Sequence, residues 1–548
     1  MRALPEDVLV LVLRHVNQAE RLSACALVST GWAKAAAMAS DAIDICTDNE
    51  DKLMPWLRHH GSHVTRFTCA YNGAPDEKEV FSMLPCRNLQ DLTLYKWEVV
   101  LLEPMHGVLC AATGLTGLHL VLEESDDLWE GGLSACTALH ALPALQHFDL
   151  SVQRVKHYGS SDEDLLPSGV ISGLTTLTRL ELRGGVALVS LQPFSCLTRL
   201  QHLNLNLGYG VVDTANAVQS GQQPFKQLQA LTHLLSMRLK GGKLVSTSSS
   251  PAFSGCSGLQ EICLNTPVDA SAFHGLTVLT KLHVWASAFL ESAPSGSAGV
   301  VALLGHISRM QQLQDFALVR GHPATAVSLR HADAAACGAI PASANLKCFD
   351  LTGLWLPRAS WAYIFPPGRR LLQLQKFELC FSNAGGVDTA LLDCSAFEHL
   401  VDCCPAIQEL SFQNLSLFEQ DVSLAPLLRL QQLARLECPH VVDGAASVGV
   451  LARLSFLRNL RLYASAGLTD VGLLQLTALT GLQELHVIDD RDFSLSFMEV
   501  MPRGRSAAFV VSTLEGLPSC RALLDDDCWQ VLGFTVQQIH SHSARCHV

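Results

Sequence analysis

Apolar residues, mostly leucines, recur along this chain at spacings of three, three and two residues. One copy consists of Leu174, Leu177, Leu180 and Leu182, and another begins at Leu197. Four further full copies begin at Leu276, Leu430, Leu454 and Leu479. Shorter copies, which keep only the spacings of three and two, begin at Val64, Leu89, Leu115, Leu145, Leu234, Leu259, Leu313, Leu346, Leu374 and Ile407.

Each copy joins two periods. A spacing of three places side chains on one face of a helical or 3₁₀ turn, and the closing alternation places two apolar side chains on one face of a short strand. One copy cannot bury its own leucines, but stacked copies form a parallel sheet with helical turns along one side. The pattern therefore predicts an α/β solenoid. The alternative is an ordinary leucine-rich helical protein, and the strand-like endings followed by Gly, Asn or Pro argue against it.

The repeats resemble the leucine-rich-repeat family over residues 42–500. The resemblance implies a leucine-rich-repeat solenoid of horseshoe shape, with the parallel sheet on a concave face where partners usually bind. Residues between the strand leucines would point to that face, and they include aromatic and Arg side chains, which are common at binding hot spots. We expect this set to bind a target protein, although each residue alone could be merely solvated. The candidates are Tyr95, His119, Arg183, His202, Asn204, Arg238, Trp285, Arg461, Tyr463 and His486.

The N-terminal residues do not follow the repeat. Pro5 and the acidic pair after it favour a helix start, and an apolar stripe then follows at helical spacing, formed by Leu9, Val12, Leu13 and Val16. We expect a second helix over 19–29 and a third over 30–38. Three short helices bury too little surface to be stable alone, so they should pack on the repeats or on a partner.

The same segment contains Leu-Pro-Glu-Asp-Val-Leu from Leu4 and Ala-Leu-Val-Ser from Ala26, with Trp32 three residues after Ser29. This order and spacing resemble an F-box. The resemblance implies a three-helix module that docks on the Skp-type adaptor of a cullin-RING ubiquitin ligase. The implied adaptor contacts are Leu4, Pro5, Leu9, Val12, Leu13, Val28 and Trp32. The alternative is that the helices only cap the hydrophobic end of the solenoid.

These patterns predict three parts: an F-box at 1–41, a solenoid at 42–500 and a C-terminal cap and tail at 501–548. The solenoid would start with a transition repeat at 42–70, which should contain a strand over 42–45 and a helix over 53–60. The resemblances imply the substrate-recognition subunit of an SCF-type (Skp-cullin-F-box) E3 ubiquitin ligase, without an active site of its own. A non-catalytic scaffold in a cytoskeletal or signalling assembly is the alternative.

Composition narrows the classes of protein further. The chain has 548 residues, 49% hydrophobic and 16% charged, and a net charge of −13. Such a chain can bury a large core, and its negative charge argues against nucleic acid or an anionic membrane as the main partner. No run of about 18 apolar residues and no signal peptide is evident. The 19 cysteines are then best explained by a reducing compartment, so we expect the cytoplasm, with the nucleus as a second location.

Signatures of catalysis and of cofactor binding are weak. The sequence contains no phosphate-binding P-loop, no nucleophile elbow, no H-E-x-x-H and no C-x-x-C pair. We therefore expect no cofactor, no metal and no catalytic residue. Two clusters contain metal-ligating residue types, but the first lies on a helix-like surface and the second at the C-terminus, so we do not expect either to bind a metal. They are His59, His60 and His63, and His540, His542, Cys546 and His547.

Overall fold

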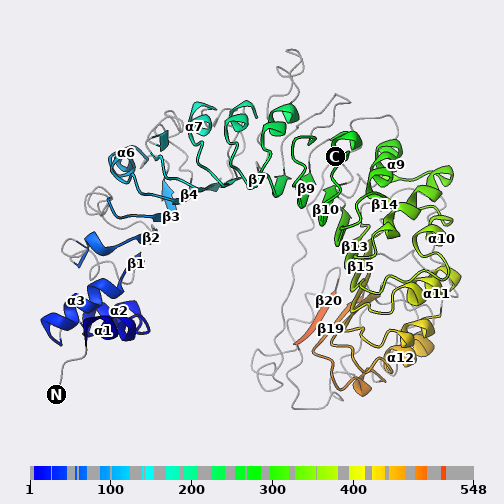
Figure 1. The fold of residues 1–548 in the computed structure, drawn as a ribbon. Coiled ribbons are helices and arrows are strands. Elements are labelled where there is room, and N and C mark those ends of the chain that lie inside the picture. Colours follow the sequence, from blue (N-terminus) through cyan, green and yellow to red (C-terminus); the bar gives the residue numbers. More distant parts are fainter. Residues whose placement is uncertain are drawn as a thin grey trace. The chain divides into compact units, whose positions relative to one another are not determined.

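The computed structural model shows two compact α/β units, Met1–Leu276 and Thr277–Val548 (Figure 1). In the part of the chain that the structure describes, no helix has both the length and the apolar character needed to cross a bilayer. The described residues are 5–25, 28–45, 56–57, 61–70, 87–98, 102–123, 139–140, 142–153, 168–184, 191–206, 224–240, 253–265, 268–285, 296–319, 327–352, 354–380, 394–413, 423–438, 444–463, 475–489 and 508–513.

The first unit starts with three helices, α1 (Glu6–Leu13), α2 (Gln18–Ser23) and α3 (Thr30–Ala39), which we call the helical module. Parallel strands follow, and each pairs with the next one along the chain. They are β1 (Ala42–Ile45), β2 (Arg66–Ala70), β3 (Asp91–Glu98), β4 (Gly117–Glu123), β5 (His147–Gln153), β6 (Arg179–Gly184), β7 (His202–Asn206), β8 (Ser236–Lys240) and β9 (Glu261–Asn265). Helices and 3₁₀ turns (η) lie between strands: η2 (Gly61–His63), α6 (Leu102–Ala111), α7 (Ser168–Gly173), η5 (Gln192–Cys196), η6 (Pro224–Ala230) and η7 (Ala270–Phe273).

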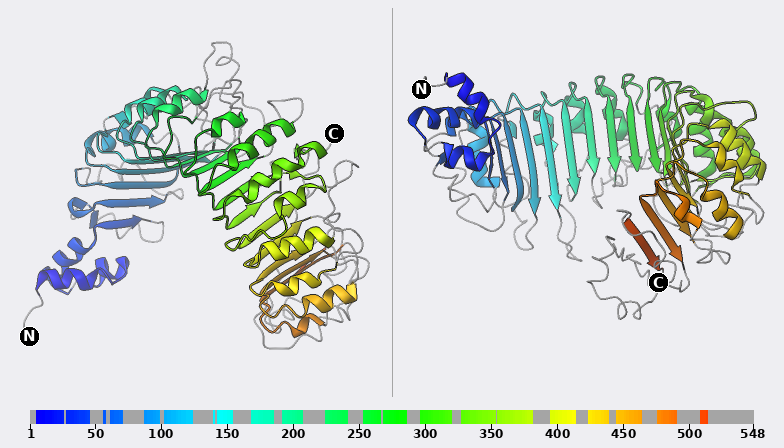
Figure 2. Two further views of the ribbon diagram at one scale, coloured as in Figure 1. Left: turned by 45° about the vertical axis from the view of Figure 1, so that its right-hand side comes forward. Right: turned by 90° about the horizontal axis from the view of Figure 1, so that it is seen from below.

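The second unit repeats this plan, and its strands also run parallel (Figure 2). The strands of its main sheet are β10 (Lys281–Trp285), β11 (Asp315–Val319), β13 (Cys348–Asp350), β15 (Lys376–Cys380), β16 (Glu409–Gln413), β17 (Arg435–Cys438), β18 (Asn459–Tyr463), β19 (Glu484–Asp489) and β20 (Ala508–Thr513). A separate pair joins β12 (Val327–Ser328) to β14 (Leu354–Trp355). The helical segments are α9 (Gly296–Ile307), η9 (His331–Ala342), α10 (Ser360–Ile364), α11 (Cys394–Cys403), η10 (Ala425–Arg429), α12 (Gly444–Leu451) and η11 (Leu476–Ala478).

The leucine spacing of three is explained by successive 3₁₀-type turns. The N–H of Leu197 donates to the carbonyl of Phe194 at 2.9 Å, and the N–H of Leu200 donates to that of Leu197 at 2.9 Å. With three residues per turn, side chains three apart lie on the same side, and all three of these residues are fully buried. The predicted architecture, a parallel sheet with helical turns along one side, is confirmed in each unit, and the fold is an α/β leucine-rich-repeat solenoid.

Successive repeats are joined by a branched backbone hydrogen bond just before each strand. The carbonyl of Thr178 accepts from the N–H groups of Gln201 (2.8 Å) and His202 (3.0 Å). In the second unit the carbonyl of Gln375 accepts in the same way from Gln408 (2.8 Å) and Glu409 (2.9 Å). This contact recurs along both units, so the backbone itself sets the register of each strand on its neighbour.

The N-terminal predictions hold for two of the three helices. The first and third lie where expected, but α2 ends at Ser23 and not at residue 29. Ser29 cannot belong to the preceding helix, because its backbone is extended (φ −166°, ψ 169°) and its hydroxyl accepts the N–H of Trp32 at 3.3 Å, which caps the start of α3. The strand over 42–45 is confirmed, whereas the helix over 53–60 lies outside the described residues except for 56–57.

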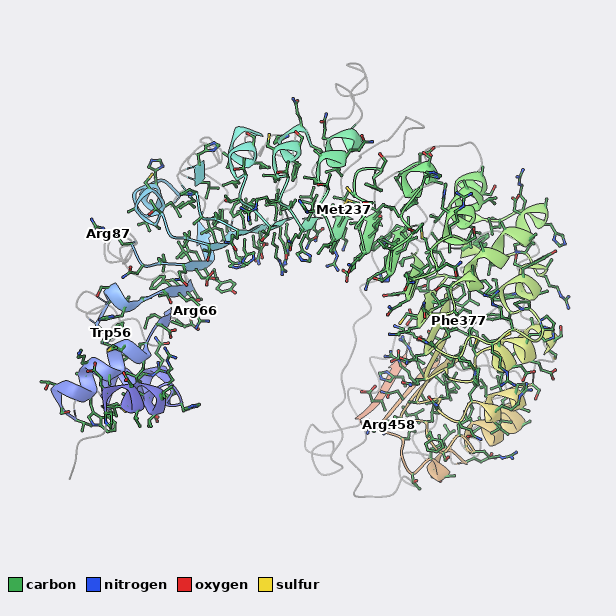
Figure 3. All side chains as sticks on the ribbon, viewed as in Figure 1. Trp56, Arg66, Arg87, Met237, Phe377 and Arg458 are labelled. Atoms are coloured by element: carbon green, nitrogen blue, oxygen red, sulfur yellow. The ribbon has the colours of Figure 1, made fainter. Side chains whose placement is uncertain are left out.

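The core lies in the layer between the strands and the helical segments, where Met237 and Phe377 are both buried (Figure 3). Several strands of the second unit carry phenylalanine in place of leucine. The ring of Phe377 lies 5.4 Å from that of Phe349 and meets the ring of Phe365 edge-on at 5.5 Å. Aromatic pairs in these geometries add to the stabilisation from burial alone.

We expect Phe377→Ala to lower the free energy of unfolding by about 3–5 kcal/mol, because it leaves a cavity inside this ring cluster. Urea unfolding followed by circular dichroism measures the effect. Phe456→Ala is the matched control, since that ring is 64% exposed, and it should change the stability by less than about 0.5 kcal/mol. Equal losses in both variants would contradict this account of the core.

Candidate binding surfaces

Helix α1 exposes apolar side chains along one of its faces. Val8, Leu11 and Val12 are 41%, 59% and 48% exposed. Their spacing of three and four residues places them on the same side of the helix, and we call this set the α1 patch. Contiguous exposed apolar side chains, unlike single scattered ones, mark candidate interaction surfaces.

The opposite side of α1 packs inside the helical module. Leu9 and Leu13 are buried with three alanines of α3, and Trp32 packs partly against them. Of the predicted adaptor contacts, Pro5, Val12 and Val28 are therefore exposed, whereas Leu9 and Leu13 lie in the interior and hold the helices together. Leu4 lies outside the described residues. The sequence prediction missed Val8 and Leu11, which belong to the exposed side.

The helical module is tied to itself and to the first strand by polar contacts. The Arg21 guanidinium donates to the carbonyls of Ala39 (2.6 Å) and Val16 (2.8 Å), which joins α2 to the ends of the other two helices. The Gln18 side chain accepts the N–H of Asp44 in β1 at 3.3 Å. The module is thus anchored at the β1 end of the first sheet.

Each sheet has a second face, opposite its helical segments, which we call the open face. Residues on it alternate with the buried leucines, as in β6, where Leu180 and Leu182 are fully buried and Arg183 is exposed. The predicted target-binding residues all occupy such alternate positions, and nothing is described of the Tyr463 side chain. Their role in binding stays a prediction. The positions are Tyr95, His119, Arg183, His202, Asn204, Arg238, Trp285, Arg461, Tyr463 and His486.

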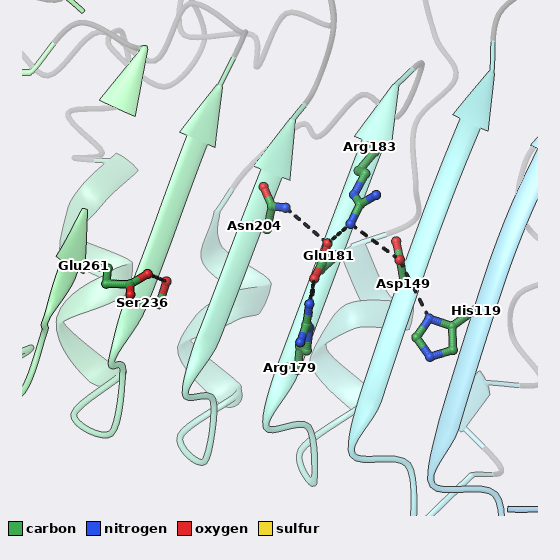
Figure 4. A network of polar contacts seen from close by, with 8 residues as sticks. All are labelled: His119, Asp149, Arg179, Glu181, Arg183, Asn204, Ser236 and Glu261. Carbon is green, nitrogen blue, oxygen red and sulfur yellow. Dashed lines mark hydrogen bonds and ion pairs between the residues drawn. The ribbon is translucent and has the colours of Figure 1, made fainter. Parts of the chain in front are cut away.

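Glu181 organises a network of polar contacts at the centre of the first open face (Figure 4). Its side chain is only 7% exposed. One oxygen accepts from the Arg179 Nε at 2.8 Å, and the other accepts from Arg183 and from the Asn204 Nδ2 at 3.1 Å. Both carboxylate oxygens are therefore occupied. The two guanidinium groups lie over the carboxylate and remain 55% and 45% exposed.

The electrostatics of this network follow from its geometry. Burial alone would raise the pKa of Glu181, but hydrogen bonds from Arg183 and Arg179 and their positive charges outweigh burial and lower the pKa to about 2. Arg183 also approaches Asp149 at 3.7 Å, as does the Nδ1 of His119. The network thus extends over the four adjacent strands β4 to β7.

The second open face has a different balance of charge. The open positions of the described strands β11, β13, β15 and β16 carry four carboxylates and, among these positions, only Lys376 as a cation. Asp315 is 3.0 Å from Lys281 and 2.9 Å from His283, and although burial opposes it, these two partners lower the pKa of Asp315. Burial raises the pKa of Asp350 despite its hydrogen bond from Thr352.

Further along the same face, Ser411 donates to the buried Glu437 at 2.9 Å, and Arg461 lies 3.4 Å from the same carboxylate. Burial lowers the pKa of His486, and the charge of Arg461 adds to this effect.

The two buried carboxylates of the open faces, Glu181 and Glu437, were not among the predicted site residues. The alternation of charged residues with leucines was the available signal.

The described side chains also bear on metal binding and on cysteine reactivity. Within the described ranges, no group of three or more His, Cys, Asp or Glu is arranged to hold a metal ion. His63 lies in η2, and the other members of both candidate clusters lie outside those ranges. Burial raises the pKa of Cys256 and of Cys337 to about 11, which suits packing and disfavours the thiolate that a nucleophile needs.

We expect the stability of the fold in acid to depend on Glu181. Its pKa in the folded chain, about 2, lies below its ordinary value of 4.5, so the ionised carboxylate stabilises the fold above pH 4.5 and this contribution is lost as the pH falls through about 2. Glu181→Gln should lower the free energy of unfolding near neutral pH by about 2 kcal/mol. The difference from the native chain should shrink as the pH falls through that range. Urea unfolding at several pH values measures it.

The matched control is Glu398→Gln, which changes an exposed carboxylate on α11. It should leave stability within about 0.5 kcal/mol of native at every pH. If the Glu181→Gln difference stayed constant from neutral to strongly acid pH, the interaction of the ionised carboxylate with the two arginines would not be its cause.

Comparison with known proteins gives a limited result. No family model matches the chain, and no curated protein matches it. Among solved structures it is similar to an internalin from Listeria monocytogenes, with 13% sequence identity, a TM-score of 0.36, and coverage of 83% of this chain and 98% of that chain. The repeat geometry described above, and not this likeness, establishes the leucine-rich-repeat fold, and the function has to be argued from the surfaces of this chain.

Proposed function

We propose that this chain is the substrate-recognition subunit of an SCF-type E3 ubiquitin ligase. The helical module would act as its F-box and bind a Skp-type adaptor, and the open faces would bind the target protein. The observation that carries the proposal is the α1 patch, an apolar surface at the very segment whose sequence resembles an F-box.

Helix α1 has more apolar surface than its own module can cover. After two acidic residues it contains six aliphatic side chains in a row, and only Leu9 and Leu13 are buried. A helix that merely packs on its neighbours needs one apolar face. The second face gains stability only when a partner removes it from water, at about 25 cal/mol for each Å² of apolar surface. Amphipathic helices commonly bind partner proteins in this way, by laying an apolar face into a groove.

The mechanism under this proposal is proximity. One chain would hold both the adaptor and the target, which raises the effective concentration of target lysines near a ubiquitin-charged enzyme held by another subunit. The residues described above would supply binding and orientation, while the transfer chemistry would belong to that other subunit.

A second function is favoured by the contacts of α2. Gln18 and Arg21 tie the helical module to β1 and to the end of α3, as a cap on the end of the sheet requires. In a scaffold protein whose helices act only as a cap, the α1 patch would bind no partner. The scaffold hypothesis therefore predicts that the chain captures no adaptor.

We expect purified chain to capture a Skp-type adaptor in a pull-down, and Leu11→Glu with Val12→Glu to weaken capture at least about tenfold. Both side chains are about half exposed, and glutamate suits a helix, so the variant should fold while it places two charges in the apolar interface. Isothermal titration calorimetry gives the affinity, and circular dichroism checks the fold.

The matched control is Leu372→Glu with Val278→Glu. These side chains are 60% and 42% exposed, close to the values for the α1 pair, but they lie in turns of the repeats. The control should bind the adaptor as the native chain does. If the native chain is folded but captures no adaptor, the ligase proposal is wrong and the scaffold hypothesis is the one supported.

A further inference from the structure

The open face of β6, β7 and β8 is basic, although the chain as a whole carries a net charge of −13. It presents nine alternate positions, three on each strand, and none is apolar. Arg179, Arg183, Arg238 and Lys240 are cations, Glu181 is the single carboxylate, and the remaining four are histidine, asparagine or serine. The net charge of these nine positions is +3 with histidine neutral. We call them the basic face.

The one negative charge on the basic face is hidden from solvent. The Glu181 side chain is 7% exposed, and the side chains of the two arginines that cover it are about half exposed. Burying a carboxylate costs desolvation energy, and apolar side chains at such sites are often as stabilising as the ion pairs. What Glu181 adds is orientation, because it holds Arg179 and Arg183 in place while both keep N–H groups free for a ligand.

The other two cations lie on β8, beside this pair. In the strand register Asn206 lies next to Arg183 and Lys240 lies next to Asn206, so with about 4.8 Å between strands Lys240 stands about 10 Å from Arg183. Arg238 lies next to Asn204 and is exposed, like Lys240. A short extended segment with a carboxylate at every second residue, spaced about 7 Å apart, fits this distribution.

The limits of the basic face decide between kinds of anionic ligand. Asp149 on β5 and Glu261 on β9 flank it, each one strand away. The basic face is therefore only about 10 Å wide, close to the screening length in physiological salt. A long polyanion such as a nucleic acid would extend past these borders, where the net negative charge of this chain would repel it. A short acidic peptide would stay within them.

We propose that the basic face binds a short segment of the target protein that is rich in Asp and Glu. Arg and Lys side chains pair with carboxylates through charge-assisted hydrogen bonds, and oriented arginines bind acidic motifs in many proteins. This assignment rests on the proposed function, since it names the class of target that the receptor would bring to the ligase.

The test uses the full chain and a labelled peptide of five residues with glutamate at every second position, whose carboxylates span about 13 Å when the peptide is extended. A serine–glycine peptide of the same length is the reference. Fluorescence anisotropy should show binding of the acidic peptide alone, weakened when NaCl rises from about 50 to about 300 mM. Arg238→Gln with Lys240→Gln should weaken binding about tenfold. Arg309→Gln with Arg453→Gln removes the same charge from exposed turns elsewhere and should leave the affinity unchanged.

A second variant tests whether binding depends on the fixed orientation of Arg179 and Arg183 or only on the net charge of the basic face. Glu181→Gln makes the basic face more positive by one charge but releases Arg179 and Arg183. The proposal expects weaker binding, whereas simple charge attraction expects tighter binding, which would overturn the positioning role of Glu181. Circular dichroism confirms that the variant is folded.

Several results would overturn the proposal: no binding of the acidic peptide by folded chain, equal losses in both double variants, or displacement of the peptide by a single-stranded oligonucleotide at lower concentration than by unlabelled peptide. The Leu11→Glu and Val12→Glu variant should still bind the peptide. A chain that captures the adaptor but not the peptide refutes this inference alone, and one that binds the peptide but no adaptor refutes only the ligase role.

Discussion

Both units depend on the branched backbone hydrogen bond that joins each repeat to the one before it. One carbonyl, such as that of Thr178, accepts two N–H groups from the next repeat. Because both N–H donors belong to the backbone, the bond forms with threonine, glutamine, lysine, alanine or arginine at this position. At the carbonyls of Asp41, Gln90 and Gln146 a threonine hydroxyl of the next repeat also donates to the same oxygen. It places the first residue of each strand opposite the first residue of its neighbour. The buried leucines of adjacent strands then lie side by side, whatever the sequence of the segment that connects the two strands.

This constraint separates packing from function within each strand. The residues that face the helical segments must be apolar, since they fill a closed layer. Residues on the open face carry no such requirement and are free to vary in charge from strand to strand. The two units use this freedom differently, with cations dominant over β6 to β8 and carboxylates dominant over β11 to β16. Binding chemistry can therefore change along the sheet while the fold stays the same.

The sequence was sufficient to predict the repeats, because spacing by three and by two has few structural solutions. It was insufficient for the helical module. Helix α1 is apolar at every position from Val8 to Leu13. Spacing therefore placed Val12 on the same stripe as Leu9 and Leu13, whereas the structure exposes Val12 together with Val8 and Leu11. That choice depends on the packing of α3, whose alanines admit the two leucines. The start of α3 likewise depends on a capping contact of Ser29 and not on apolar spacing.

The network around Glu181 shows what a local pattern can and cannot reveal. The segment Arg-Leu-Glu-Leu-Arg at 179–183 places three charged residues on one face, about 7 Å apart along the strand. Alternation alone therefore predicts that the carboxylate lies between two guanidinium groups. Alternation does not predict that Asn204, from the next repeat, donates the last hydrogen bond and completes the burial of the carboxylate. That contact exists because the backbone register places Asn204 beside Glu181, so the same bond that stacks the leucines also assembles the polar surface.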